Sequence, residues 1–305
     1  MRVLVTGGAG FIGSHIVRRL MEHGHDVAVL DNLSRGREEN LPRGVRFYRA
    51  DVTSWEIGEI FAKEEPECVV HQAAQIDVRR SVADPAMDAR VNIIGSINLL
   101  EHCRKTGVRK VVYASSAAVY GDPQILPVPE EHPILATSGY GVSKHTVEHY
   151  LEVYRKLYGL DYTVLRYANV YGPRQDPLGE GGVVAIFSHR IARRLAVTIF
   201  GDGEQTRDYV FAGDVAEANA LALTKAGGEV LNISTGVEVS VNQLLRALEE
   251  LSGRKAEVRH APERPGEIRR SALDNSRARR SLGWVPKVPL SEGLEQVLAY
   301  EMSRL

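Results

Sequence analysis

Tyr140 and Lys144 are the residues whose types and spacing best fit acid–base chemistry. They stand in the stretch Ser-Gly-Tyr-Gly-Val-Ser-Lys at 138–144, and residues four apart lie on one face of a helix. Lowering a tyrosine pKa from about 10 to about 7 takes about 4 kcal/mol, which a nearby ammonium and a cationic cofactor ring would supply together. We therefore predict that Tyr140 is a general base at neutral pH. Because Y-x-x-x-K alone is a weak signal, the interpretation depends on three further features.

The first feature is a glycine-rich turn between an apolar run at 2–6 and an amphipathic stretch at 14–22. Its sequence is Gly-Gly-Ala-Gly-Phe-Ile-Gly at 7–13. Glycines allow a tight turn and close approach of the backbone to a pyrophosphate, and the following helix offers free amides to the anion. The pattern predicts a dinucleotide site.

Asp31 ends a second apolar run, at 26–30, about 20 residues beyond the last glycine of the turn. A carboxylate there accepts hydrogen bonds from the adenosine ribose and repels a 2'-phosphate, which favours NAD over NADP. Arg35 and Arg37 nearby weaken that preference. Asp51, after the third predicted strand at 45–49, fits either an adenine contact or a helix N-cap.

The second feature is the serine pair Ser115-Ser116, which follows a predicted strand at 110–114. The carboxyl ends of parallel strands form the ligand edge of a sheet, so Ser116 can share a substrate hydroxyl with Tyr140. Simple turn chemistry is the alternative for two serines after a strand.

Alternating strands and helices over the first half predict a Rossmann-type doubly wound parallel sheet. A long helical tract is expected at 82–106. From Asn169 the alternation fails, so we expect an NAD-binding domain at 1–168 and a smaller α/β substrate-capping domain mainly at 169–305. A helix at 214–225 and a strand at 229–233, within a segment at about 206–235, are expected to return to the main sheet.

Composition narrows the class of protein. The 305 residues carry a net charge of -1 and 44% hydrophobic side chains, so no basic field points to nucleic acid. We find no signal peptide and no apolar run of membrane-spanning length, and we expect a cytoplasmic protein without a membrane partner. Cys68 and Cys103 lack metal or disulfide spacing and are expected to be buried thiols.

The stretch His-Thr-Val-Glu-His at 145–149 matches the H-x-x-E-H pattern of zinc proteases. Its side chains lie about 100° around the helix from Tyr140 and Lys144, and no third ligand is indicated. We expect no metal site, and interpret the histidines as solvated or dimer-facing.

Four further stretches accompany these motifs: Asp31-Asn32-Leu33, His71-Gln72-Ala73-Ala74, Ser115 to Gly121 and Leu165 to Asn169. Together they resemble the extended short-chain dehydrogenase/reductase family over essentially the whole chain, most closely its UDP-glucose 4-epimerases. The resemblance implies bound NAD, Tyr140 as base, Lys144 tuning it, and Ser116 positioning the proton. The expected cofactor-binding residues are Gly7, Gly10, Phe11, Ile12, Gly13, Asp31, Asn32, Asp51, Val52, Ala73, Ala74, Gln75, Asn92, Ser115, Tyr140, Lys144 and Ala168.

The third feature, a nucleotide-sugar grip in the second half, is likewise implied by the resemblance. The reaction implied is reversible oxidation at C4 of a UDP-sugar through a 4-keto intermediate, an isomerase activity without net redox change. Asn169, Arg207 and Arg264 would hold the diphosphate, for which arginine is well suited. The other expected substrate contacts are Ser116, Tyr140, Val183, Phe200, Glu267 and Ser271. A homodimer through helices around 92–106 and 140–157 is also implied.

Departures from the family concern the substrate. Ala117-Ala118 stand where dehydratases of the superfamily carry an Asp-Glu pair, so that chemistry lacks its carboxyls. Ser271 lies where narrow-specificity epimerases have a tyrosine, which predicts activity on N-acetylated UDP-sugars. The enzyme alternatives are a UDP-glucuronate 4-epimerase, which would need a donor such as Arg79 or Arg174, and another nucleotide-sugar-modifying short-chain dehydrogenase/reductase. A non-catalytic NAD-sensing protein is a more distant alternative.

Overall fold

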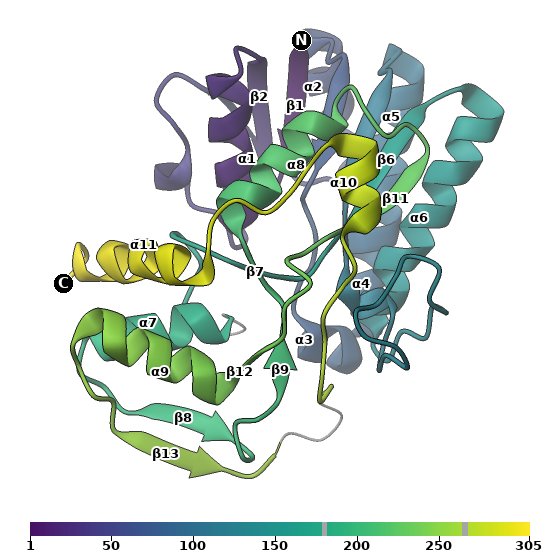
Figure 1. Cartoon of the computed structure of the whole chain (residues 1–305). Coiled ribbons are helices and arrows are strands. Elements are labelled where there is room, and N and C mark those ends of the chain that lie inside the picture. The colour runs from purple at the N-terminus through teal and green to yellow at the C-terminus, as the bar shows by residue number, and fades with distance from the viewer. Residues whose placement is uncertain (179–181, 264–267) are drawn as a thin grey trace.

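Seven short runs rich in β-branched residues form one parallel sheet, in the order β11-β6-β5-β4-β1-β2-β3 (Figure 1). The computed structural model describes residues 1–178, 182–263 and 268–305. The strands of this sheet are β1 (Arg2–Thr6), β2 (Asp26–Asp31), β3 (Arg46–Arg49), β4 (Cys68–His71), β5 (Lys110–Ser116), β6 (Asp161–Tyr167) and β11 (Glu229–Ile233). The predicted Rossmann-type fold is confirmed, and the strand expected at 229–233 pairs with β6.

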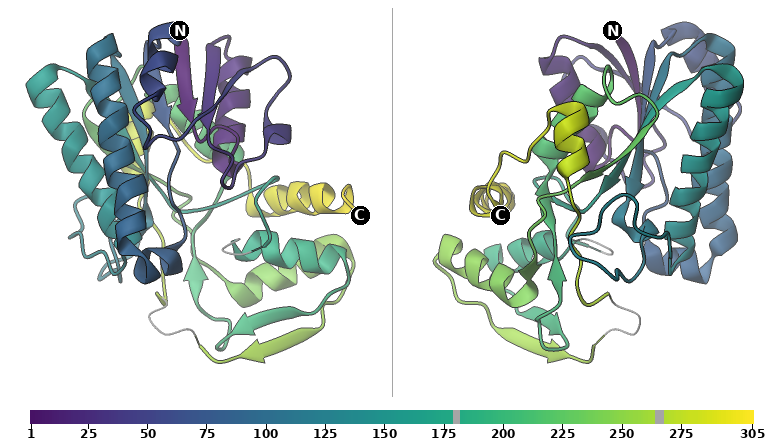
Figure 2. Two further views of the ribbon diagram at one scale, coloured as in Figure 1. Left: turned by 180° about the vertical axis from the view of Figure 1, so that it is seen from behind. Right: turned by 45° about the vertical axis from the view of Figure 1, so that its right-hand side comes forward.

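Helices cover both faces of this sheet, because its central strands are apolar on both sides. The helices α1 (Phe11–Glu22), α8 (Ala212–Ala222) and α10 (Ser276–Leu282) pack on one face. On the other face lie α2 (Ile57–Glu64), α5 (Gly95–Thr106) and α6 (Gly139–Tyr158). Figure 2 shows the amino-terminal end of β1 pointing away from the smaller unit, so the carboxyl ends of the strands face it.

The expected helical tract at 82–106 is interrupted, and this prediction was wrong in detail. It consists of α3 (Val78–Ala83), α4 (Pro85–Ala89), the π-helical turn η2 (Arg90–Ile94) and α5. Proline at 85 restricts Asp84 to a non-helical backbone, and the Asp84 carboxylate accepts a hydrogen bond from the Met87 amide at 3.0 Å. The chain therefore restarts a helix at this point.

A second, smaller unit lies at the carboxyl edge of the sheet and has its own apolar core. It contains α7 (Val183–Ala192), α9 (Val241–Ser252), α11 (Leu290–Met302) and the parallel pair β8 (Val197–Phe200) and β13 (Val258–Ala261). Shorter pairs link the two units: β7 (Asn169–Tyr171) with β10 (Tyr209–Phe211), and β9 (Thr206–Arg207) with β12 (Val239–Ser240). Strand β13 was not anticipated from the sequence, and the domain boundary at 168 stays a prediction.

Asp208, between β9 and β10, fastens the segments at the junction of the two units. Its carboxylate accepts hydrogen bonds from the amides of Thr235, Gly236 and Leu273 at 2.8, 2.9 and 3.2 Å, and from the Thr235 hydroxyl at 2.6 Å. The side chain is 1% exposed. A carboxylate without hydrogens suits four converging donors.

We predict that Asp208→Asn destabilises the protein by about 2–3 kcal/mol, because the amide group places N–H hydrogens against N–H donors in a buried site. The urea midpoint of unfolding would measure the loss. Asp202→Asn is the matched control, since Asp202 pairs with Arg269 on the exposed surface and such pairs contribute little. Equal midpoints for the two variants would contradict the role given to Asp208.

Candidate active site

A cavity of about 430 Å³ lies along the carboxyl edge of the main sheet. Parallel register brings the ends of β1, β2, β4 and β5 to this edge, since Thr6 pairs with both Leu30 and His71. Most of the predicted cofactor residues line the cavity: Gly7, Gly10, Phe11, Ile12, Gly13, Asp31, Asn32, Asp51, Val52, Ala73, Ala74, Ser115, Tyr140 and Lys144. Gln75, Asn92 and Ala168 do not line it.

The glycine turn forms one wall of the cavity and has no room for side chains. A Cβ atom at Gly13 would overlap the carbonyl oxygen of Gly7, and one at Gly7 would lie 2.7 Å from the amide nitrogen of Ala73. Gly7 also has a φ of +67°, in the left-handed region, which costs little only for glycine. The turn thus leaves backbone at the cavity surface, and α1 begins there with its first-turn residues Phe11 and Ile12 lining the same space.

Asp31 ends β2 and is held in place by the backbone. Its carboxylate accepts hydrogen bonds from the amides of Ala9 at 3.0 Å and Leu33 at 2.8 Å, and burial raises its pKa. A carboxylate has about four acceptor positions, so Asp31 keeps capacity for a further donor in the cavity. Arg35 and Arg37, the two arginines that made the preference for NAD less certain, each lie near a carboxylate. The guanidinium of Arg35 lies 3.6 Å from the Asp77 carboxylate, and that of Arg37 lies 3.6 Å from the Glu39 carboxylate.

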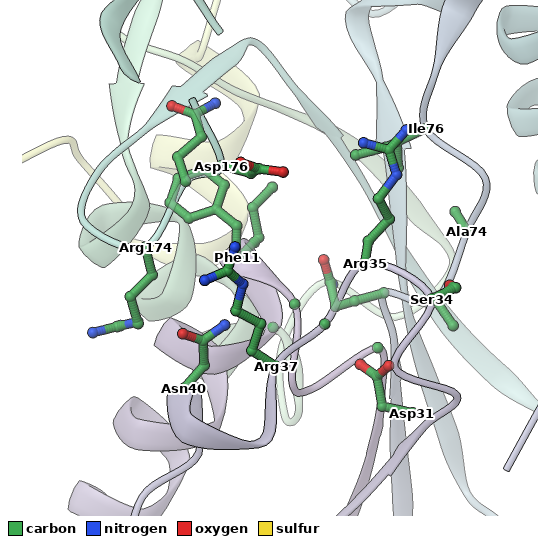
Figure 3. A pocket seen from close by; sticks show the side chains of 18 of the residues that line it. Phe11, Asp31, Ser34, Arg35, Arg37, Asn40, Ala74, Ile76, Arg174 and Asp176 are labelled. Carbon is green, nitrogen blue, oxygen red and sulfur yellow. The ribbon is translucent and has the colours of Figure 1, made fainter. Parts of the chain in front are cut away.

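Figure 3 shows Phe11, Arg37, Asn40 and Arg174 on one side of the cavity, and Asp31, Ser34 and Ala74 on the other. Asp51 lies beyond Asp31, where it accepts a hydrogen bond from the Asn32 side chain at 2.8 Å and from the Thr53 amide at 2.8 Å. The helix N-cap expected as the alternative was wrong, because Glu56 precedes α2 and Asp51 closes a turn with Thr53; Asp51 lines the cavity, and its contact with adenine stays a prediction.

Asn92 is buried behind the cavity wall. Its side-chain amide donates to Gln75 O at 3.0 Å and to Ser143 Oγ at 3.0 Å, and its Oδ1 accepts from the Gln75 amide at 2.8 Å. Asn92 thereby joins the loop after β4 to the helix that carries Tyr140. The structure gives Asn92 a positioning contact, whereas direct contact with the cofactor stays a prediction.

Tyr140 and Lys144 line one end of the cavity, and Ser116, which is not among the lining residues, lies beside Tyr140. Tyr140 and Lys144 lie one turn apart at the start of α6, where Ser138 caps the helix by accepting from the Gly141 amide at 3.2 Å. The side chain of Ser116, at the end of β5, is hydrogen-bonded to Tyr140. Lys144 is buried, and its ammonium donates to Ala114 O at 2.8 Å.

The pKa of Tyr140 differs from the value near 7 that the sequence analysis expected. Burial raises the pKa of Tyr140 to about 12, while the hydrogen bond with Ser116 acts in the opposite direction. Burial also lowers the pKa of Lys144 to about 8, although the carboxylates of Asp88 and Glu148 favour its charged form. The Lys144 nitrogen lies 5.9 Å from the centre of the Tyr140 ring. The described groups of the chain therefore do not by themselves produce the predicted base.

Glu148, one turn beyond Lys144, fixes α6 to the sheet. Its carboxylate accepts from Arg166 Nε at 3.0 Å and Nη2 at 2.6 Å, and from the Ser115 hydroxyl at 2.5 Å. Burial opposes the charged form, but the bonds from Arg166, His145 and Ser115 outweigh it and lower the pKa of Glu148 to about 2. The catalytic helix and the end of β5 are thereby joined through one carboxylate.

The predicted substrate residues lie mainly in the smaller unit. Phe200 ends β8, Arg207 lies in β9 and Val183 begins α7. Asn169 opens β7, and its amide donates to Asp208 O at 2.9 Å. Asn169, Val183, Phe200, Arg207 and Ser271 are not among the residues that line the cavity, and Arg264 and Glu267 lie outside the described residues.

Sequence reasoning missed a group of cavity residues from the second half of the chain. Arg174, which the sequence analysis considered only as a donor for a glucuronate carboxylate, follows β7 with a φ of +72° and donates to Ser14 Oγ at 2.9 Å. The others come from α7 and from α11 and its end, where Glu301 bonds His189 and Arg193 at 2.9 Å each. These residues are His189, Arg193, Tyr300, Glu301 and Arg304. No motif marks them, because only the packing of α11 on α7 brings them to the cavity.

These features define an enzyme of the dinucleotide-dependent dehydrogenase/reductase class: a doubly wound sheet, a glycine turn, a carboxylate at the end of β2 and a Ser-Tyr-Lys group at the edge of the sheet. Residues 3–234 match the NAD dependent epimerase/dehydratase family. The chain belongs to that family.

The chain is also similar to other proteins over nearly its whole length. It is 48% identical to the UDP-glucose 4-epimerase of Mycolicibacterium smegmatis, with 98% of each chain covered. A crystal structure of the Thermotoga maritima UDP-glucose 4-epimerase with UDP-glucose is 50% identical, with a TM-score of 0.97 over 100% of this chain and 99% of that one. The Thermus thermophilus UDP-glucose 4-epimerase in complex with NAD is 47% identical, with a TM-score of 0.95 over 100% of both chains.

The residues of the cavity fit NAD, the cofactor of the family. Gly7 and Gly13 leave the space that a pyrophosphate needs, Asp31 presents a carboxylate for a ribose, and Lys144 and Tyr140 stand at the opposite end from Asp51 along the row of strands. The glycines, Asp31 and Lys144 are the residues that would hold the cofactor.

We predict that Gly13→Ala lowers the NAD content of the purified protein at least tenfold, because the added methyl group would push the Gly7 carbonyl into the cofactor space. NAD released by acid precipitation measures the content. Gly24→Ala is the control: Gly24 follows α1 outside the cavity, with a φ of +76° and nothing within 4 Å of an added Cβ, so the change adds backbone strain without filling cofactor space. Full NAD content in Gly13→Ala would refute this use of the turn.

Proposed function

We propose that the protein is an isomerase that catalyses NAD-dependent C4 epimerisation of UDP-glucose and UDP-galactose. The observation that carries the proposal is the position of Ser116 beside Tyr140, which together with Lys144 lines a cavity suited to NAD. The relatives named UDP-glucose 4-epimerase, 47–50% identical over the full chain, support the same substrate pair.

The residues of the chain provide binding and proton transfer. NAD, when bound, supplies the hydride acceptor and a positive charge. Tyr140 takes the proton of the sugar 4-hydroxyl, and Ser116 holds that hydroxyl and the phenol in one hydrogen-bonded group. Lys144 stabilises the phenolate by its charge, since its ammonium is fixed by Ala114 O beside the tyrosine. The 4-keto sugar then rotates to present its opposite face before Tyr140 returns the proton.

A turning sugar requires a firm grip on the nucleotide. We assign this grip to Asn169, Arg207 and Arg264 at the diphosphate, Phe200 and Val183 at the uracil, and Glu267 at the uridine ribose. Arg207 stands in β9, and the antiparallel partner strand β12 fixes its backbone. An arginine on a strand with a hydrogen-bonded partner suits a diphosphate, because the planar guanidinium presents its N–H donors in a fixed fork.

The alternative substrate UDP-glucuronate is not favoured by the position of Arg174. That side chain bonds Ser14 of α1 and lies beside Phe11 on the glycine-turn side of the cavity (Figure 3), and Arg79 does not line the cavity. A non-catalytic NAD sensor is disfavoured by the intact group of Ser116, Tyr140 and Lys144.

We further propose that two copies of the chain associate through η2, α5 and α6. Val142, Val153 and Leu157 recur at helical spacing along α6 and are 45–66% exposed, and Ile94 in η2 is 56% exposed. A second copy would cover these side chains, as expected for a homodimer.

We predict that Tyr140→Phe lowers the rate of UDP-galactose conversion at least 100-fold, the usual contribution of a general base. Conversion is followed by NMR of the two UDP-sugars, with NAD content and circular dichroism unchanged. Tyr158→Phe, an exposed tyrosine on the same helix, is the control and should keep wild-type activity. More than a tenth of the activity in Tyr140→Phe would overturn the assigned mechanism.

The small side chain at 271 generates a second prediction, about specificity. Wild-type protein should convert UDP-N-acetylgalactosamine as well as UDP-galactose, and Ser271→Tyr should lower only the first activity, at least tenfold. Ser276→Tyr, at an exposed position of α10, is the control. Background turnover of the N-acetylated sugar by the wild type would show that residue 271 does not leave room for it.

A further inference from the structure

Asp88, in α4, is a buried carboxylate without an assigned role in the proposed reaction. The residue is 1% exposed. Its Oδ1 accepts hydrogen bonds from Gln75 Nε2 at 2.8 Å and from Asn92 Nδ2 at 3.1 Å. Both donors converge on one oxygen, and the carbonyl oxygen of an asparagine could accept both bonds as well. Hydrogen bonding therefore does not explain why a charged residue stands at this position.

The same contacts join Asp88 to the start of the catalytic helix. Asn92 Nδ2 also donates to Ser143 Oγ at 3.0 Å, and the Ser143 hydroxyl donates to Tyr140 O at 3.0 Å. Ser143 directly precedes Lys144 in the chain, and α4 packs against α6. Asp88 thus has a fixed place beside the helical turn that carries Tyr140 and Lys144.

The groups of β4 and β5 that face Lys144 bring it no negative charge. The ammonium donates to Ala114 O, and the ring centres of Tyr113 and Tyr140 lie 5.0 and 5.9 Å from it. Burial raises the pKa of Tyr113, so this phenol stays neutral. His71 also stays neutral, because burial and the charge of Lys144 lower its pKa to about 3.

Two carboxylates act on Lys144, and they differ in how far their charge is compensated. Glu148 pairs with the Arg166 guanidinium at 2.6 Å, so a bound cation offsets most of its field. The donors to Asp88 in the described part of the chain are the neutral amides of Gln75 and Asn92. Since buried charges need a counter-charge, the less compensated carboxylate is the one that Lys144 matches.

We propose that Asp88 is the counter-charge of Lys144 and a positioning residue for proton transfer, since it keeps Lys144 charged beside Tyr140. The catalytic part of this inference rests on the proposed function. Burial lowers the pKa of Lys144 to about 8, while the charge of Asp88 acts in the opposite direction, as a nearby opposite charge does. A neutral Lys144 could not stabilise a phenolate.

Asp88 acts on Tyr140 in the opposite sense. Burial raises the pKa of Tyr140 to about 12, and the negative charge of Asp88 acts in the same direction. Removing this charge would therefore favour the phenolate and, at the same time, favour the neutral form of Lys144. Activity at a single pH would sum these two opposite effects, so the titration of Lys144 must be measured by itself.

Asp88→Asn tests the charge alone, because the asparagine oxygen can keep both hydrogen bonds. In NAD-loaded protein without sugar, NMR of carbon-13-labelled lysine should show Lys144 titrating at least one pH unit lower than in the wild type. Lys144→Arg assigns the signal, and circular dichroism and NAD content verify the fold. Asp84→Asn is the matched control and should leave the titration unchanged. Asp84 is exposed and caps α4 through the Met87 amide, which asparagine does equally well.

The pH dependence of UDP-galactose conversion supplies a second measurement. Because Lys144 would lose its proton at lower pH in Asp88→Asn, the ratio of the rate at pH 8.5 to the rate at pH 7 should fall at least threefold. An unchanged Lys144 titration, the same change in Asp84→Asn, or a rate ratio equal to that of the wild type would overturn the proposal. If the wild type converts no UDP-galactose, the epimerase proposal fails, whereas the titration still decides whether Asp88 is the counter-charge of Lys144.

Discussion

The position of the catalytic helix depends on one buried carboxylate. Glu148 receives two hydrogen bonds from Arg166 in β6 and one from Ser115 in β5, so α6 is held against the end of two strands. Removing one partner of such a pair leaves an uncompensated buried charge, at a cost of about 3–5 kcal/mol, yet a well-packed apolar replacement of the whole pair is often neutral. The directional hydrogen bonds from Ser115 and Arg166 to Glu148 fix the position of α6, and with it that of Tyr140 beside Ser116. An apolar contact would fix that position less precisely.

The same burial that positions the site also sets its charges. Loss of water around Tyr140 raises its pKa to about 12 and lowers that of Lys144 to about 8, so desolvation disfavours both charged forms. A phenolate therefore requires additional positive charge, and bound NAD brings one. In the proposed reaction, proton removal by Tyr140 would therefore depend on bound NAD.

Local sequence signals predicted the first half well. The glycine turn, Asp31 and the Tyr-x-x-x-Lys spacing lie within single strand–turn–helix units, whose geometry follows from neighbouring residues. The break at Asp84 was missed because a helical pattern resumes one residue later. The roles of Glu301, Arg193 and His189 could not be predicted, since α11 meets α7 only after a separation of about 100 residues in the chain. Buried pKa values were mispredicted for the same reason: they depend on three-dimensional enclosure.

The division of the molecule into two units suits a reaction that must present both faces of one sugar. NAD held at the sheet edge by the glycine turn, Asp31 and Lys144 would present one face to the sugar, so the sugar would have to turn instead. A sugar can turn only if the protein holds it elsewhere, and Val183 and Phe200, the described residues proposed at the uracil, lie in another unit from Tyr140. Asp208 and the strand pairs β7–β10 and β9–β12 then keep these units in register. A firm hold on the nucleotide and room for the sugar to turn are thus two consequences of one geometric requirement.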